Sequence, residues 1–262
     1  MMKLDRQLDT AIAAAKEAGR IQMERLGHVR DIQFKGEINL VTEVDKLCEE
    51  TIFKILKGPF PQYGTLGEES GGQKGDSDFK WIVDPLDGTT NYAHSYPLFC
   101  VSIALEYKGE IVCGVVYEPN LAELFVAEKG SGATLNGRRL AVSKIDRLKR
   151  ALLATGFAYN VQQTEIDNLS HFGDFIKTAQ AVRRDGVAAT DLCYVAAGRF
   201  DGFWEIGLFP WDIAAGALIV KEAGGQVTAF DGSTVDTYGK EILVSNGLIH
   251  EAMIDVLKAK QS

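Results

Sequence analysis

Apolar residues recur at helical spacing in two stretches near the start of the chain. Leucine, isoleucine and alanine return every three to four positions over 3–26, a pattern that predicts one long helix ending at Gly27. The same spacing returns over 43–57, where Thr42 stands in the position of an N-cap and Gly58 precedes a proline. Both segments are therefore expected to be amphipathic helices with one buried face.

Between 79 and 140 the pattern changes to short apolar runs that are typical of strands. The runs at 99–107 and 111–117 flank a Lys-Gly-Glu turn and predict a hairpin. A further strand is expected at 121–127, before a glycine-rich turn. The segment 142–152 has no clear pattern, and we expect it to cross between domains.

The second half of the chain alternates between helical and extended patterns. This alternation is typical of an α/β unit, whereas the first half has the pattern of an α+β unit. We place the boundary near residue 145, so that 1–145 forms a metal-binding half and 146–262 supplies substrate contacts. The expected helices cover 164–178, 186–197, 212–223 and 248–260, and the expected strands cover 200–206, 226–230 and 241–245.

Composition narrows the class of protein. The 262 residues carry a net charge of -8, whereas a nucleic-acid-binding surface would be basic. The four cysteines form no C-x-x-C pair and lie in apolar settings, so we expect reduced core thiols in a cytoplasmic protein. The start of the chain lacks the apolar core of a signal peptide, and no apolar run reaches the roughly 18 residues that span a membrane. We therefore expect neither nucleic-acid nor membrane partners.

The most informative stretch is WIVDPLDGTTN. Three apolar residues end a buried strand, and Asp84 and Asp87 follow with no lysine or arginine among them. The proline between the two acids makes a rigid turn, which can aim both carboxylates at one point and free the Leu86 carbonyl as a further ligand. Gly88 permits close backbone approach, and Thr89 adds a hydroxyl and an N–H group that suit a phosphate.

Other motifs share this acidic chemistry. GEES carries Glu68 and Glu69, PWDIAAG carries Asp212 before a helix, and NLVTEVD carries Asp45. Oxygen ligands of this kind suit hard cations, Mg²⁺ above all. Each motif alone also has a structural interpretation: the two aspartates as helix caps, GEES as a solvated loop, and D-P-x-D-G as an exposed turn. The last is the weakest, because that turn is anchored between two apolar strands.

Other types of active site fit less well. GSGATLNG is not followed by GK[ST], so a nucleotide-binding loop is not indicated. Ser70 and Ser102 have no evident histidine partner for a serine hydrolase, and the histidines are too scattered for a zinc site. The pair Arg183-Arg184 suits a phosphate clamp and a solvated helix end equally.

Together these motifs resemble those of the inositol monophosphatase family. WIVDPLDGTTNY and PWDIAAGALIVKEAGG are similar to its two signatures, and GEES, NLVTEVD and YVAAGRFDGFWE occur in the family's order. The resemblance covers almost the whole chain. It implies a layered αβαβα sandwich of the inositol monophosphatase and fructose-1,6-bisphosphatase type, with the site between the two halves. It also implies a Mg²⁺-dependent, Li⁺-inhibited hydrolase of small phosphate monoesters, usually a homodimer.

Carried over position by position, the resemblance also implies roles for individual residues. It selects the first glutamate of GEES over the second, a choice that chemistry alone leaves open. It implies two or three Mg²⁺ ions at each site. Metal ligands would be Glu68, Asp84, the Leu86 carbonyl, Asp87 and Asp212; catalysis would rest on Asp45 and Thr89, which activate the water, and on Glu68; substrate contacts would come from Asp87, Gly88, Thr89, Gly186, Ala188, Glu205 and Asp212.

One departure from the family pattern bears on the substrate. The family often has a Gly-Ser/Thr-Ala run after a basic residue, whereas Gly186-Val187-Ala188 follows Asp185 here. The resemblance favours myo-inositol 1-phosphate. Histidinol phosphate, fructose 1,6-bisphosphate and a nucleotide 3′-phosphate stay open, as does a non-catalytic binding or regulatory protein that keeps the fold. For a nucleotide, Phe157, Tyr159 and Trp204 are the candidate aromatic platforms.

Overall fold

The computed structural model describes residues 4–28, 32–35, 39–158, 161–162, 164 and 167–259. Helices in these ranges correspond closely to those expected from apolar spacing. The last described segment is a short helix that precedes the C-terminus. The helices are α1 Asp5–Arg25, α2 Glu43–Lys57, α3 Thr89–Ala93, α4 Leu169–Thr178, α5 Ala188–Ala196, α6 Pro210–Glu222 and α7 His250–Lys258, with a 3-10 turn at Leu148–Arg150.

The larger sheet has eight strands in the order β10-β9-β8-β7-β6-β5-β3-β4. Neighbouring strands run antiparallel except β3 and β5, which are parallel. The expected hairpin is confirmed as β6 and β7. The strands are β3 Gly64–Gly67, β4 Gly71–Gln73, β5 Phe79–Asp87, β6 Cys100–Tyr107, β7 Glu110–Glu118, β8 Glu123–Glu128, β9 Gly132–Leu135 and β10 Arg138–Arg139.

The smaller sheet has five strands in the order β12-β11-β13-β15-β14. β11 runs parallel to both of its neighbours, and β15 runs antiparallel to β13 and β14. A separate two-stranded ribbon, β1 with β2, precedes α2. The bounds are β1 Ile32–Lys35, β2 Asn39–Thr42, β11 Leu152–Thr155, β12 Ala181–Arg183, β13 Gly202–Ile206, β14 Gln226–Thr228 and β15 Glu241–Ser245.

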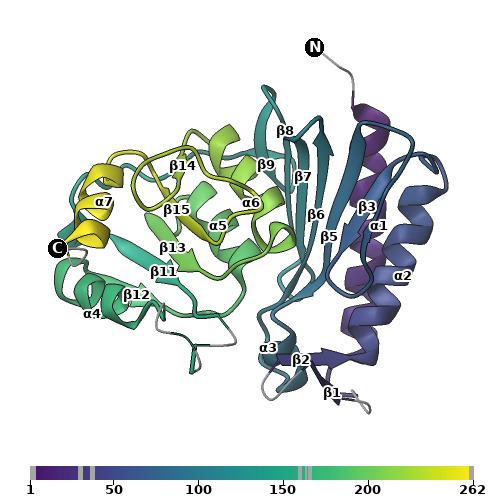
Figure 1. The fold of residues 1–262 in the computed structure, drawn as a ribbon, viewed down its shortest axis with the longest axis horizontal. Coiled ribbons are helices and arrows are strands. Elements are labelled where there is room, and N and C mark those ends of the chain that lie inside the picture. The colour runs from purple at the N-terminus through teal and green to yellow at the C-terminus, as the bar shows by residue number, and fades with distance from the viewer. Residues whose placement is uncertain are drawn as a thin grey trace.

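These elements stack as five layers, which Figure 1 shows from right to left. Helices α1 and α2 cover one face of the eight-stranded sheet, and α5 and α6 lie between the two sheets. Helices α4 and α7 cover the outer face of the five-stranded sheet. The expected αβαβα sandwich is confirmed. The division at residue 145 stays a prediction.

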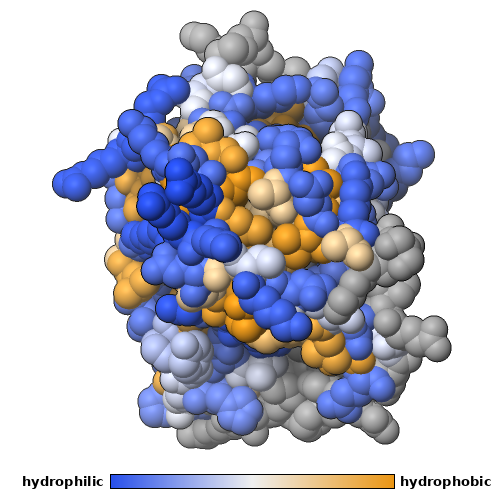
Figure 2. Space-filling model, turned by 90° about the vertical axis from the view of Figure 1, so that its left-hand side faces the viewer, coloured by the Kyte–Doolittle hydropathy of each residue, from blue (hydrophilic) through white to orange (hydrophobic). Residues whose placement is uncertain are grey.

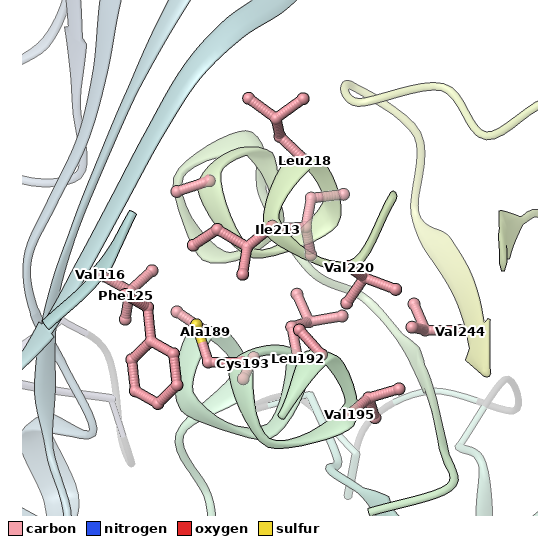
Figure 3. Packing of buried hydrophobic residues seen from close by; sticks show 14 of the residues in the cluster. Val116, Phe125, Ala189, Leu192, Cys193, Val195, Ile213, Leu218, Val220 and Val244 are labelled. Carbon is pink, nitrogen blue, oxygen red and sulfur yellow. The ribbon is translucent and has the colours of Figure 1, made fainter. Parts of the chain in front are cut away.

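Successive side chains of a strand point to opposite faces of the sheet, which explains how the eight-stranded sheet contributes to two hydrophobic cores. On β5, Trp81 and Val83 pack toward α1 and α2, whereas Ile82 packs toward α5 and α6. Figure 3 shows the middle core, where Phe125 from the large sheet meets Cys193 of α5. The middle layer is thus buried on both sides, and it fixes the position of α6 relative to β5.

Local signals explain the helix beginnings. The Thr42 hydroxyl accepts a hydrogen bond from Val44 N, and the Asp45 carboxylate accepts one from Thr42 N, which together form a capping box. Helix α1 ends at Arg25, and Gly27 follows with a φ of 76°, as its position predicts. All four cysteines are buried and free, as expected.

Several expectations about the elements were wrong. The segment 142–152, for which no element was expected, contains the 3-10 turn and the first residue of β11. The glycine-rich turn contains strand β9, and β12 has no counterpart among the expected strands. Helix α4 begins at Leu169 because Asn168 has a φ of 64°, which an α-helix does not accept. The two missed strands are short, with four residues in β9 and three in β12.

Candidate active site

The D-P-x-D turn lies at the end of β5, where the pairing with β6 loses its register between Asp84 and Asp87. Asp84 is buried, and its Oδ1 accepts a hydrogen bond from Leu86 N at 2.9 Å. The buried Gln22 of α1 donates from Nε2 to the Pro85 carbonyl at 2.8 Å. A register shift of this kind is typical of a β-bulge, and the two carboxylates are close enough for the charge of Asp87 to raise the pKa of Asp84.

Helix α3 begins directly after this turn. Gly88 has a φ of 92°, and a Cβ there would lie 2.8 Å from Val187 Cγ2, so no larger residue fits. Thr89 is buried, and its hydroxyl lies 2.9 Å from Asp45 Oδ1 and 3.0 Å from the Leu86 carbonyl oxygen. A hydroxyl has one proton, so it donates to one of these two acceptors at a time. The expected Asp45–Thr89 pair is therefore in contact.

Glu68 reaches the turn from the neighbouring strand. β3 pairs in parallel with β5, and Gly67 is opposite Val83 in the register. The Glu68 backbone N–H continues this pairing with a hydrogen bond to the Val83 carbonyl at 3.3 Å. Its carboxylate is close enough to raise the pKa of both Asp84 and Asp87.

Asp212 comes from the middle layer. It lies in the first turn of α6, and its Oδ2 accepts a hydrogen bond from Phe209 N at 2.7 Å. Asp212 is therefore not the N-cap of α6, which is Phe209, although its side chain accepts the hydrogen bond of the N-cap backbone. The charge of Asp212 also raises the pKa of Asp84, which lies on β5 of the eight-stranded sheet.

The start of α5 closes the site from the second half of the chain. Asp87 Oδ2 accepts a hydrogen bond from Ala189 N at 2.7 Å, and Ala188 is buried beside it. Asn91 Nδ2 donates to the Asp185 carbonyl at 2.9 Å and so ties α3 to the loop before α5. Gly186 in this loop has a φ of 77°. Hydrogen bonds therefore join the region around Asp87 and α3 to the start of α5, about a hundred residues later in the sequence.

Glu205 lies on β13, close enough to Asp87 and Asp212 for their charges to act on it. It is buried, and a Cβ on Gly156 would lie 2.3 Å from its Oε2, so the carboxylate occupies space that only a glycine leaves open. Burial, with the charges of Asp212 and Asp87, raises the pKa of Glu205, and Arg184 opposes this rise. Arg184 follows strand β12, so of the two interpretations of the Arg183-Arg184 pair the solvated helix end is wrong.

The electrostatics of the cluster have one dominant cause. Burial raises the pKa of Asp87 to about 7, helped by Glu68 and opposed by the Ala189 N–H group. Burial and the charge of Asp87 raise the pKa of Asp212 to about 8. The pKa of Asp84 lies well above its ordinary range because of burial and the charges of Glu68, Asp87 and Asp212. The surroundings of these carboxylates therefore disfavour their negative charge, and a positive charge placed beside them would be stabilising.

Comparison with known proteins identifies the family. The sequence model of the inositol monophosphatase family matches residues 3–262. The chain belongs to the inositol monophosphatase family. It is 47% identical over 255 residues to inositol-1-monophosphatase of Synechocystis sp., which covers 96% of this chain and 88% of the relative. The solved inositol monophosphatase of Anabaena is 42% identical, has a TM-score of 0.91 and covers 98% of this chain and 97% of its own.

A relative with a different name is equally similar. Nus factor SuhB of Pseudomonas aeruginosa is 43% identical over 261 residues, which cover 96% of this chain and 95% of the relative. Several relatives at 42–47% identity over most of the chain are named inositol-1-monophosphatase. The chain is therefore an enzyme of the phosphate monoester hydrolase type, and its particular substrate is a separate question.

The donor set of this family member fits Mg²⁺. The side chains that share the pKa effects are all carboxylates, and hard oxygen ligands are those that Mg²⁺ prefers. Within the described residues, no three acidic, histidine or cysteine side chains converge at metal-ligand spacing. Bound cations would supply the positive charge that these buried carboxylates lack.

Other sequence candidates have different places in the structure. Trp204 is fully buried, and its Nε1 donates to Asn168 Oδ1 at 2.8 Å, so it is core and not a platform. The Phe157 ring packs edge-on against Phe172, with 5.7 Å between centroids. Tyr159 lies outside the described residues. Val187 is buried against Gly88, so the position where the family often has a hydroxyl is apolar here.

Sequence reasoning missed the residues that hold the site residues in place. Gln22, Asn91 and Glu49 each donate to or accept from the backbone of a site loop. Gln22 stands on the alanine-rich apolar face of α1, and a polar residue on a buried face is a signal that could have found it. The other two carry no pattern of their own in the sequence.

Proposed function

We propose that this chain hydrolyses a phosphate monoester, with myo-inositol 1-phosphate as its favoured substrate, by direct in-line attack of water. Glu68, Asp84, the Leu86 carbonyl, Asp87 and Asp212 would hold two or three Mg²⁺ ions. Bound there, Mg²⁺ would neutralise the substrate's charge and lower the pKa of a water molecule. The 2.9 Å hydrogen bond between Thr89 and Asp45 is the observation that carries the proposal.

This pair supplies a path for a proton. When the Thr89 hydroxyl donates to Asp45 Oδ1, its lone pairs face away and can accept from a water beside the acidic turn. Burial raises the pKa of Asp45, whereas hydrogen bonds from Thr42 and Thr89 oppose that rise. A carboxylate with a raised pKa is the better proton acceptor. The water oxygen would then form its bond to phosphorus as the ester oxygen leaves and takes a proton from solvent.

The remaining residues would position the substrate. The N–H groups of Gly88 and Thr89 stand at the start of α3, where a phosphate oxygen can accept from them. Gly186, Ala188 and Glu205 lie on the side of the second half, where the leaving group would be. The Glu205 carboxylate would accept a hydrogen bond from a sugar hydroxyl.

The first test is phosphate release from D-myo-inositol 1-phosphate with Mg²⁺ and with EDTA, plus one assay with Li⁺. Turnover that requires Mg²⁺ and falls with Li⁺ supports the chemistry and the substrate class. No release at any Mg²⁺ concentration rejects inositol phosphate, and the other three monoesters are then assayed in its place. No release from any of the four rejects all four as substrates.

A matched pair of variants tests the ligand assignment. Glu68→Gln should lose roughly 10²-fold or more in turnover, since it removes a group that acts on transition-state charge. Glu69→Gln changes the adjacent residue of the same turn and should keep most of the activity. Equal losses in the two variants would contradict the selection of Glu68.

One comparison favours a second role that does not need catalysis. The relative named Nus factor SuhB is as similar as those named for the phosphatase activity. We therefore retain a binding or regulatory function as the alternative. Phosphate release that EDTA abolishes and Asp87→Asn removes would assign this site to catalysis.

We also propose a cytoplasmic homodimer. Four free, buried thiols suit a reducing compartment. None of the described helices is long and apolar enough to cross a lipid bilayer. Figure 2 shows apolar surface between charged residues on the face that carries α4 and α7, and Leu169 and Ile176 of α4 are both exposed. Light scattering should give twice the monomer mass, and Ile176→Glu should halve it.

A further inference from the structure

Glu49 is a buried carboxylate outside the set of proposed ligands. It lies on α2 one turn after Asp45, so both side chains leave the helix on the same face. Only 3% of the residue is exposed. Its two oxygens accept hydrogen bonds from successive backbone N–H groups, Glu69 N at 2.9 Å and Ser70 N at 2.8 Å. A carboxylate that accepts two such bonds is held firmly in one orientation.

These contacts complete the anchoring of the turn that carries Glu68. The N–H group of Glu68 itself bonds to the Val83 carbonyl, one residue before Asp84. Three consecutive N–H groups, at residues 68, 69 and 70, are therefore all held. The first is held by β5 and the next two by α2, so the backbone on either side of the Glu68 side chain has little freedom.

The approach of Glu49 depends on the residue before Glu68. A Cβ on Gly67 would lie 2.3 Å from Glu49 Oε2 and 2.9 Å from Phe53 Cε2. The Glu49 carboxylate thus occupies the space that a side chain at residue 67 would need. Helix α2 reaches the turn directly, with no water-sized gap between them.

We propose that Glu49 is a positioning residue that fixes the direction of Glu68 toward Asp84 and thereby sets the affinity of the site for Mg²⁺. This inference rests on the proposed function, because it assigns Glu68 to the metal. Through Asp45 and Glu49, one helix would then hold both the proton-accepting pair and a metal ligand. Groups that orient ligands in this way typically change metal affinity by about 10- to 100-fold when they are removed.

The test uses Glu49→Gln with Glu50→Gln as the matched control. Glu50 is the next residue of α2 and is exposed. Glutamine keeps the shape but presents an N–H₂ group to one of the two N–H donors. We expect Glu49→Gln to need about 10- to 100-fold more Mg²⁺ for half of the maximal thermal stabilisation, with kcat at saturating Mg²⁺ nearly unchanged. Amide exchange at residues 69 and 70 of the metal-free protein should accelerate in this variant alone.

A double-mutant cycle separates positioning from a purely structural role. If Glu49 acts through Glu68, its effect on Mg²⁺ affinity should disappear in a Glu68→Gln background. An effect of equal size in both backgrounds would overturn the proposal, as would an unchanged Mg²⁺ requirement in Glu49→Gln. Should Glu49→Gln fail to fold, Glu49→Asp keeps the charge, shortens the reach and goes through the same cycle.

The proposed function can fail separately. If the wild-type protein shows no stabilisation by Mg²⁺, the metal assignment is wrong, and the inference about Glu49 fails with it. If the wild-type protein responds to Mg²⁺ and the two glutamine variants at 49 and 50 behave alike, only the inference about Glu49 fails.

Discussion

Asp87→Asn should stabilise the metal-free protein at alkaline pH and should also remove most of its response to Mg²⁺. Burial raises the pKa of Asp87 from its ordinary 3.8 to about 7 in the folded protein. The folded state therefore binds a proton more tightly than the unfolded chain does. The stability from this carboxyl is fully present below about pH 4 and is lost as the pH rises through about 7.

The size of the effect follows from the two pKa values. Each pKa unit corresponds to about 1.4 kcal/mol, so a rise from 3.8 to about 7 corresponds to about 4 kcal/mol. Asparagine avoids this cost but accepts a weaker, neutral hydrogen bond from Ala189 N, a loss of about 1 kcal/mol. A net gain of about 3 kcal/mol shifts the melting temperature of a protein of this size by about 10 °C.

The assay is thermal unfolding in EDTA and in excess Mg²⁺, at about pH 5 and about pH 8. In EDTA the variant should melt above the wild type at the higher pH, and the difference should be much smaller at the lower pH. With Mg²⁺ the wild type should gain stability through binding, and the variant should gain little. Asp9→Asn, an exposed change on α1, is the control and should match the wild type throughout. A variant that melts at or below the wild type at about pH 8 in EDTA would refute the electrostatic reasoning.

Two further variants test the turn. Thr89→Val preserves shape and removes the hydroxyl between Asp45 and the Leu86 carbonyl, so phosphate release at saturating Mg²⁺ should fall by roughly 10²-fold or more, whereas the melting-temperature gain from Mg²⁺ should persist. A full loss of the Mg²⁺ response would instead make Thr89 a structural residue. Gly88→Ala places a Cβ 2.8 Å from Val187 Cγ2 at a φ of 92°, which should cost about 1–3 kcal/mol in urea unfolding. An alanine variant of unchanged stability would show that the turn adapts.

The sequence was most informative where the residues that determine a local structure all lie within one short segment. The capping box of α2 was readable because Thr42 and Asp45 are three residues apart, and both of its hydrogen bonds are present. The D-P-x-D turn was readable for the same reason. The contact between Asp45 and Thr89 could not be predicted from a local pattern, because 44 residues separate them. It followed only from the family resemblance.

The unpredicted parts depend on tertiary contacts that leave no local pattern. β12 has three residues, and it becomes a strand only because β11 lies beside it. Glu49 looks like one more polar residue of an amphipathic helix. Its role appears only when the GEES turn is placed against α2, where it accepts two backbone hydrogen bonds. No spacing rule within α2 distinguishes Glu49 from the exposed Glu50 beside it.

The acidic cluster also shows how fold stability and metal binding oppose one another. Asp84, Asp87 and Asp212 all accept backbone N–H hydrogen bonds, and each of these bonds opposes a rise in pKa. Burial and mutual repulsion nevertheless outweigh these hydrogen bonds, since all three pKa values stay raised. The backbone therefore orients these carboxylates without neutralising them, and the free energy that repulsion removes from the metal-free fold is returned when cations bind. It follows that substitutions at these three positions should stabilise the metal-free protein in the same order in which they weaken its response to Mg²⁺.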